Sequence, residues 1–455
     1  MKLAILGGAG ARVPLVLVGL LRQKDELRFD EVVLWDIDQE RQQMIGRICA
    51  AIIERYGASL KVRVGNTLED TLEGSDFIIA SVRVGGTQSR VIDERLALEA
   101  GVLGQETVGP GGWAMALRTI PVVLHYAQTA EKVAPKAWLL NFTNPVGIVL
   151  QALLAAGVKR TIGVCDTPRE MFENVATQLG ISSKSAFFDY LGLNHLGWLR
   201  SVSADGYDLL PELLKHCDRL GHIYHVPLFT SDYLQQLGLL PTEYVYFYLN
   251  YERTVQKLKQ TSQTRGQMVA EQEKQLFEQV AAAGNDNAKA AAAYDNFLAS
   301  RNATYFQLET GAPVGQQKME MARKELYEKS AGYERIAVDV MKAIAGNRPA
   351  VFPVDVANNG SMDELDLNDA VEVPCVIDAN GARPLAVGAI PGPVRSLLFR
   401  VKEYERLTAK AALERSAKLA VEALTLNPVV PSREVAEQLG PRYLKSHGET
   451  LAYLK

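Results

Sequence analysis

The beginning of the chain holds the pattern that most restricts its fold. A short apolar run, residues 3–6, leads directly into Gly7, Gly8 and Gly10, and an apolar helical face follows over residues 15–21. A buried strand that turns tightly into a helix is the start of a βαβ unit. Glycines in such a turn let backbone amides approach a pyrophosphate at the helix N-terminus. We therefore expect Gly7, Gly8 and Gly10 to bind a dinucleotide.

The second apolar run supports the same interpretation. Residues 32–35 are apolar and end at Asp36, where a carboxylate accepts hydrogen bonds from the adenosine ribose hydroxyls. The third glycine of the usual motif is missing, because Val13 stands in its place. The alternative is a plain βα turn in a flavodoxin-like domain.

Further apolar runs alternate with helical patterns through the first part of the chain. They cover residues 77–82, 137–142 and 161–164. Continuous apolar runs are typical of parallel strands that are buried on both faces. The sequence therefore predicts an α/β fold, with a Rossmann-type parallel sheet in residues 1–180.

The pattern changes after about residue 180. Residues 252–300 are rich in Ala, Gln, Lys and Glu, which predicts helices with exposed faces. Residues 371–389 are strand-like, and Asn380-Gly381 marks a hairpin turn. One long amphipathic helix is expected over residues 394–424. We interpret residues 181–455 as an α+β domain that completes the site formed by the nucleotide domain.

Composition excludes several classes of protein. The 455 residues include 49 Lys plus Arg and 53 Asp plus Glu, and this balance argues against a nucleic-acid partner. Four cysteines are too few for a disulfide framework and fit a reducing compartment. No apolar run reaches the roughly 18–20 residues of a membrane span, and the N-terminus lacks the pattern of a signal peptide. We therefore expect a cytoplasmic protein with no membrane partner.

Polar side chains follow two of the predicted strands. Asn144 closes the run Asn-Phe-Thr-Asn before a proline, and Cys165-Asp166 follows the next strand. Ligands of open α/β sheets bind outside the carboxyl ends of strands, so Asn144 is placed to hydrogen-bond a sugar or a nicotinamide. A Cys165 thiolate and a His195 imidazole would suit Mn, Fe, Co or Ni. The alternatives are a turn-forming Asn-Pro pair, a buried thiol and a hydrogen-bonded core histidine.

Two other segments are interpreted as incidental or structural. A denser group of possible ligands lies in a loop that no strand end presents, and we interpret its histidines as incidental. The group consists of His216, Cys217, His222 and His225. The glycine-dense residues 104–112 are interpreted as structural, and a backbone that approaches a ligand closely is the alternative.

A tyrosine and two arginines complete the candidate residues. Tyr244 begins an aromatic run, and a tyrosine can act as a general base when a nearby cation lowers its pKa. Such runs more often mean packing. Arg90 and Arg265 carry the side chain best suited to bidentate phosphate contact, and surface salt bridges are the alternative for both.

These motifs occur together and in order, and in this combination the chain resembles glycoside hydrolase family 4, the NAD- and metal-dependent glycosidases. The resemblance covers nearly the whole chain. The matching segments are GGAGAR, VVLWDID, VRVGGTQSRVIDE, GQETVGPGG, NFTNPVG, GVCD, GLNHLGW, the tyrosine run and YERLT. The resemblance implies a nucleotide domain like that of the lactate and malate dehydrogenases.

The resemblance also implies a mechanism outside the usual two-carboxylate scheme. Bound NAD oxidises the carbon-3 hydroxyl of the substrate, a base removes the carbon-2 proton, the leaving group is eliminated, and water adds before NADH reduces the ketone. A divalent ion, Mn first and otherwise Fe, Co or Ni, stabilises the enolate. The corresponding residues here are Cys165 and His195 as metal ligands, Tyr244 as base, Asp166 as general acid, and Arg90, Asn144 and Arg265 as substrate contacts, the arginines holding a 6-phosphate.

The substrate implied by the resemblance is a phosphorylated disaccharide or glucoside. The segments GGTQSRVIDE and ALRTIP resemble the 6-phospho-β-glucosidase branch, which we favour, whereas Asp166 is the residue of the 6-phospho-α-glucosidases. A 6-phospho-α-glucosidase or another family 4 glycosidase is therefore the alternative, followed by a malate- or lactate-type dehydrogenase. The family also suggests a homodimer or homotetramer.

Overall fold

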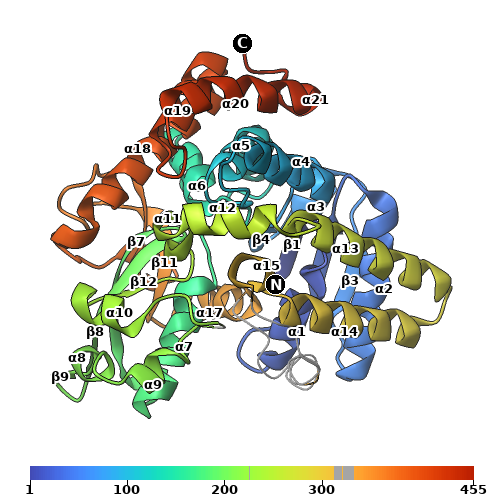
Figure 1. Ribbon diagram of the computed structural model, residues 1–455. Helices are drawn as coiled ribbons and strands as arrows, with labels where there is room; N and C mark the ends of the chain where they lie inside the picture. The colour runs from blue at the N-terminus through green and yellow to red at the C-terminus, as the bar shows by residue number, and fades with distance from the viewer. Residues whose placement is uncertain (225, 312–319, 321–332) are drawn as a thin grey trace.

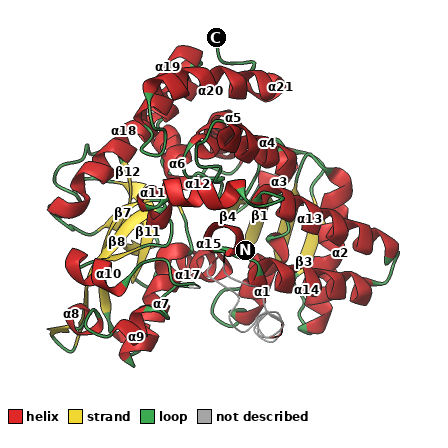
Figure 2. Cartoon of the chain, viewed as in Figure 1, coloured by secondary structure: helices red, strands yellow, loops and turns green. Residues whose placement is uncertain are grey.

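The structure is a computed structural model that describes residues 1–224, 226–311, 320 and 333–455. The described strands form one mixed sheet with helices around it (Figure 1, Figure 2). Along the sheet the strands follow the order β10-β8-β7-β12-β11-β6-β5-β4-β1-β2-β3, with β9 beside β8 and β13 beside β12.

The strands are β1 (Lys2–Leu6), β2 (Glu31–Trp35), β3 (Lys61–Val64), β4 (Phe77–Ala80), β5 (Trp138–Asn141), β6 (Thr161–Gly163), β7 (Phe187–Leu193), β8 (Leu196–Ala204), β9 (Tyr207–Asp208), β10 (Leu240–Pro241), β11 (Ala350–Ala357), β12 (Ala370–Asp378) and β13 (Gly381–Pro384). The helices are α1 (Val13–Arg22), α2 (Gln39–Arg55), α3 (Leu68–Leu72), α4 (Gly86–Glu99), α5 (Pro110–Val133), α6 (Val146–Ala155), α7 (Thr167–Leu179), α8 (Leu210–Leu213), α9 (Cys217–Leu220), α10 (Ser231–Leu237), α11 (Val245–Leu249), α12 (Tyr251–Lys259), α13 (Arg265–Ala282), α14 (Asn287–Ala303), α15 (Gln307–Thr310), α17 (Tyr333–Gly346), α18 (Gly392–Glu414), α19 (Ala417–Leu426), α20 (Arg433–Ser446) and α21 (Gly448–Leu451).

The first half of the chain builds a parallel sheet. Strands β3, β2, β1, β4, β5 and β6 are neighbours in that order and all pair in parallel, which is the Rossmann order. Every residue of β4 and β5 is buried, as expected when helices cover both faces. The predicted α/β fold is confirmed. The sequence did not indicate β3, because its residues are half-buried or exposed and form no apolar run.

The second half extends the same sheet with antiparallel strands. Asp355 of β11 pairs with Gly163 of β6, and β12, β7 and β8 follow outward. The sheet is therefore continuous past residue 180, and the division into domains 1–180 and 181–455 stays a prediction. The hairpin expected at Asn380-Gly381 is confirmed, since β12 pairs with β13 around it.

The helices expected over residues 252–300 are confirmed as α12, α13 and α14. The single helix expected over residues 394–424 is wrong, because α18 ends at Glu414 and α19 begins at Ala417. Arg415 adopts a left-handed φ of 58°, and the Ser416 side chain caps the new helix. The amphipathic pattern continues from α18 into α19, so the pattern alone does not reveal the break between the two helices. No described helix combines the length and apolarity that crossing a membrane requires.

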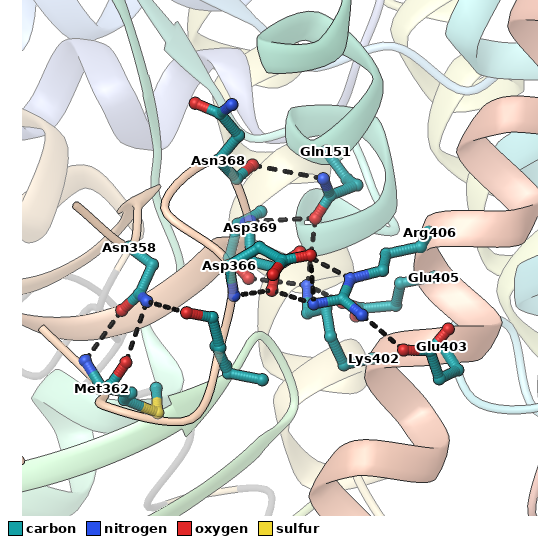
Figure 3. Close-up of polar contacts among 12 residues, drawn as sticks. Gln151, Asn358, Met362, Asp366, Asn368, Asp369, Lys402, Glu403, Glu405 and Arg406 are labelled. Atoms are coloured by element: carbon teal, nitrogen blue, oxygen red, sulfur yellow. Dashed lines mark hydrogen bonds and ion pairs between the residues drawn. The ribbon is translucent and has the colours of Figure 1, made fainter. Parts of the chain in front are cut away.

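Buried ionic contacts fix α18 against the sheet (Figure 3). Lys402 Nζ is fully buried and contacts Glu405 Oε2 at 2.5 Å and Gln151 Oε1 of α6 at 3.2 Å. Arg406 Nε donates to Asp369 Oδ1 at 2.7 Å. A buried charge is tolerated when it is paired and hydrogen-bonded. These contacts fix the segment that leads into β12.

Candidate active site

The glycine turn lies tightly between the ends of β2 and β4. Gly7 has a φ of +96°, and a Cβ there would lie 2.2 Å from the carbonyl oxygen of Ser81. A Cβ on Gly8 would lie 2.8 Å from the amide of Trp35, and one on Gly10 would lie 3.0 Å from the Gly7 oxygen. Only glycine fits the first two positions without movement. The turn is a backbone cradle at the start of α1 that fits a dinucleotide.

Asp36 lies directly against this turn. Its Oδ2 accepts a hydrogen bond from the Ala9 amide at 3.1 Å, and its Oδ1 accepts one from the Asp38 amide at 3.1 Å. Burial raises the pKa of Asp36 above its ordinary value. The carboxylate is thus positioned beside the turn, where a ribose would follow a bound pyrophosphate.

A row of paired residues connects the strands that lead into Cys165 and His195. The row consists of Gly163, Asp355, Glu372 and Gly192, on β6, β11, β12 and β7. Cys165 lies two residues beyond one end of the row, and Asn194 lies two residues beyond the other. Asn194 Nδ2 donates to Glu372 Oε1 at 3.3 Å. The sheet register therefore links two segments that are thirty residues apart in sequence.

The segment after Asn144 packs against the turn that contains Asn194 and His195. A Cβ on Gly147 would lie 3.2 Å from Asn194 Cβ, so glycine permits α6 to approach this closely. The Asn144 Oδ1 atom is buried and has no hydrogen-bond partner among the described residues. A buried polar atom needs a partner, and a substrate hydroxyl or a cation could supply it.

Tyr244 and His195 are in direct contact. Their rings stack at a centroid distance of 3.9 Å and an interplanar angle of 13°. His195 is buried and has a positive φ of 63°, an unusual conformation that is concentrated at functional sites. The Tyr244 hydroxyl lies 3.4 Å from the Tyr305 hydroxyl, which donates to Glu243 Oε1 at 2.5 Å. The tyrosine predicted as a base therefore lies on the residue predicted as a metal ligand.

The donor set at Cys165 and His195 fits a borderline divalent ion. Burial lowers the pKa of His195 to about 4, so its imidazole is neutral at pH 7 and offers a lone pair. Burial, followed by the charge of Glu372, raises the pKa of the Cys165 thiol. A cation at the sulfur would favour the thiolate. Among the described residues no three His, Cys, Asp or Glu side chains are grouped to hold a metal.

Asp166 follows Cys165 and is half-buried. Burial raises the pKa of Asp166 to about 7, and the positive charge of Arg12 opposes the rise. A carboxyl group with this pKa can give or accept a proton near neutral pH. Arg12 belongs to the glycine turn, so Asp166 is electrostatically coupled to the nucleotide turn.

Arg90 lies in a buried ionic cluster. Its Nε contacts Glu94 Oε1 at 2.7 Å, and its Nη1 contacts Glu106 Oε2 at 2.9 Å. Burial alone would raise the pKa of Glu106, but Arg83 and Arg90 hold it well below its ordinary value. Glu106 belongs to the glycine-dense loop that we interpreted as structural. Sequence reasoning did not single out Glu106 as a site residue. The feature that could have revealed it is that Glu106 is a charged residue in a loop rich in glycine.

Glu94 connects Arg90 with the start of α13, where Arg265 lies. The second carboxylate oxygen of Glu94 accepts a hydrogen bond from the Gly266 amide at 2.6 Å. The Arg265 guanidinium donates to the carbonyls of Thr304 at 3.1 Å and Arg301 at 3.2 Å. Both predicted phosphate-binding arginines thus lie where α4 meets α13.

The histidine group of residues 216–225 is only partly described. His216 Nε2 contacts Glu212 Oε1 at 3.1 Å on the surface. His225 lies outside the described residues, as does the side chain of Cys217. The interpretation of these histidines as incidental stays a prediction.

Comparison with known proteins agrees with this arrangement. The chain matches the model for family 4 glycosyl hydrolase over residues 2–181 and that for the family 4 glycosyl hydrolase C-terminal domain over residues 190–430. A probable 6-phospho-beta-glucosidase of Bacillus subtilis is 31% identical, over 98% of this chain and 96% of that protein.

Solved structures give the same result. The 6-phospho-beta-glucosidase of Thermotoga maritima, solved with manganese, NAD+ and glucose-6-phosphate, is 26% identical with a TM-score of 0.82, over 100% of this chain and 99% of that chain. A 6-phospho-alpha-glucosidase from gut microorganisms, solved with NAD and glucose-6-phosphate, is 27% identical with a TM-score of 0.82, over 99% and 98% of the two chains. A malate dehydrogenase of Plasmodium falciparum, 13% identical with a TM-score of 0.50 over 91% and 99%, shares the fold alone. The chain belongs to glycosyl hydrolase family 4.

Proposed function

We propose that this enzyme hydrolyses 6-phosphoglucosides by NAD-dependent oxidation at carbon 3, carbon-2 deprotonation, elimination and water addition. The observation that carries the proposal is the stack of Tyr244 on His195 at 3.9 Å. This contact places the proposed base beside a proposed metal ligand. A sugar whose oxidised carbon is bound at the metal would then have its acidified carbon-2 proton next to Tyr244. The relatives with 6-phosphoglucosidase names support the substrate class.

Each group of residues has a separate task in this proposal. Gly7, Gly8, Gly10 and Asp36 hold NAD, and Cys165 and His195 hold the divalent ion, with Mn favoured over Fe, Co or Ni. When bound, NAD takes and returns the hydride and the metal polarises the ketone oxygen.

The remaining proposed residues act on the sugar. Tyr244 removes the carbon-2 proton, and Asp166 protonates the leaving oxygen, for which a pKa of about 7 suits it. Asn144 hydrogen-bonds the sugar through its unpartnered Oδ1. Arg90 and Arg265 hold the 6-phosphate.

The β-linked 6-phosphoglucosides are the proposed preferred substrates. An elimination from the oxidised sugar does not require one particular anomer, so Asp166 is compatible with either branch. Comparing kcat/KM for the α- and β-linked 6-phosphoglucosides of p-nitrophenol decides the preference. A higher value for the α-anomer would assign the enzyme to the other branch.

The reaction itself is tested with NAD, Mn²⁺ and a reductant. EDTA should abolish release of p-nitrophenol, and Tyr244→Phe should lower kcat about 10²- to 10⁴-fold, whereas the control Tyr251→Phe should not. Hydrolysis in heavy water should place deuterium at carbon 2 of the product. A product without deuterium would contradict the elimination, and net accumulation of NADH would indicate a dehydrogenase.

We further propose a cytoplasmic location and a homodimer or homotetramer. The location is supported by the need to keep the Cys165 thiol reduced for metal binding. Light scattering during gel filtration measures the oligomeric state, and a monomer would contradict the proposal.

A further inference from the structure

Helix α14 connects the nucleotide turn with the proposed phosphate site. At its middle, the Tyr294 hydroxyl donates to the Ala11 carbonyl at 2.8 Å. Arg301 lies seven residues later on the same helix face, about 10 Å further along the axis. There the Arg301 carbonyl accepts a hydrogen bond from Arg265 Nη2 at 3.2 Å. Figure 1 shows α14 beside α13, which begins at Arg265.

The Arg301 guanidinium differs from the other arginines around it. It is half-buried, and it makes no hydrogen bond or ion pair with any residue that the structure describes. Arg83 and Arg90, by contrast, share the Glu106 carboxylate. Arg265 is bound by backbone carbonyls. Arg301 therefore has five N–H donors available to a ligand.

The charges around Arg301 favour an anion. Burial and the charges of Arg12 and Arg265 lower the pKa of Arg301 to about 10, and Glu273 and Glu106 oppose this only in part. Of these two carboxylates, Glu106 is already paired with two other arginines, Arg83 and Arg90. A guanidinium held near two like charges is destabilising unless an anion binds among them.

We propose that Arg301 is a third arginine of the substrate-phosphate site and sets the preference for a phosphorylated over a neutral sugar. The inference rests on the proposed function. A phosphate monoester carries a charge of about −1.5 to −2 at pH 7, and the arginine fork matches its oxygens. The sugar phosphate is favoured over the cofactor pyrophosphate, because the Arg301 carbonyl accepts a hydrogen bond from Arg265. Since the charge of Arg12 in the glycine turn also acts on Arg301, the Kd of NAD is measured alongside.

The test compares Arg301→Gln, Arg301→Lys and the control Lys289→Gln. Lys289 is on the same helix, and its ammonium is exposed and paired with Asp286 at 3.3 Å. We measure inhibition constants for glucose 6-phosphate and for glucose, and the Kd of NAD. Arg301→Gln should weaken glucose 6-phosphate about 10- to 100-fold, which corresponds to losing a hydrogen bond to a charged group. The inhibition constant of Arg301→Lys for glucose 6-phosphate should lie between those of the wild type and Arg301→Gln. The inhibition constant of the control Lys289→Gln should match that of the wild type.

Binding of glucose and NAD should change less than twofold in every variant. The thermal midpoint of Arg301→Gln should equal or exceed that of the wild type, because the folded protein loses a repelled charge. Unchanged inhibition by glucose 6-phosphate, or a weakened Kd of NAD instead, would overturn the role of Arg301. If the wild type itself does not prefer glucose 6-phosphate over glucose, the proposed function fails, irrespective of Arg301.

Discussion

Replacing Gly7 by alanine tests whether the glycine turn is shaped by contact or only by backbone conformation. Gly7 has a φ of +96°, and its added Cβ would lie 2.2 Å from the Ser81 oxygen. The chain offers a matched control in Gly157, which has a φ of +83° and nothing within 4 Å of an added Cβ. The two substitutions share the cost of a left-handed alanine, and only Gly7→Ala adds an overlap.

The magnitudes separate the two variants. A left-handed alanine costs about 1–2 kcal/mol, and a stiffer unfolded chain returns about 0.4–1 kcal/mol, so Gly157→Ala should lose about 1 kcal/mol. The overlap at Gly7 adds about 1–3 kcal/mol. It also moves the turn by roughly 1 Å to reach normal contact. Losing one amide bond to a charged phosphate would weaken NAD about 10- to 100-fold.

Urea unfolding followed by tryptophan fluorescence measures the first effect, and calorimetric titration with NAD measures the second. Gly157→Ala should bind NAD as the wild type does. Equal losses of stability in the two variants would show that the overlap with Ser81 has no energetic weight. Wild-type affinity for NAD in Gly7→Ala would refute the assignment of the turn to the cofactor.

Two further predictions concern buried charges. Arg118→Leu should lower the free energy of unfolding by about 3–5 kcal/mol, because it removes the guanidinium whose Nη2 lies 2.6 Å from the buried Asp93 carboxylate. The exposed control Arg433→Leu should leave the urea midpoint almost unchanged. A similar shift of the midpoint in both variants would contradict the reasoning. Asp355 pairs with Glu372 across β11 and β12, and burial, followed by the Glu372 charge, raises the pKa of Asp355 well above its ordinary value. As pH rises above about 4, the unfolded chain releases this proton first, so stability should fall by about 1.4 kcal/mol per pH unit until the folded pKa is reached. Asp355→Asn should make that slope shallower in urea unfolding between pH 5 and 8, with the remainder coming from other buried carboxyls such as Glu372, whose pKa is raised to about 7; an unaltered slope would show that Asp355 does not hold the proton.

Local patterns predicted the parts of the site that follow directly from the chain. The glycine turn, Asp36 and the Cys165-Asp166 pair each occur at the end of an apolar strand, and parallel strands end at the same edge. Strand β3 and the break at Arg415 were missed, because neither changes the apolar pattern on which the predictions depended.

Sequence alone therefore determined the nucleotide fold, the family and the residue types at the strand ends, since these depend on short-range pattern and on order along the chain. Tertiary structure decided which charges meet. Glu106 and Arg301 lie almost two hundred residues apart, yet they belong to one electrostatic cluster with Arg265. Whether a charged side chain is paired or available depends on the helices packed around it, and no local pattern carries that information.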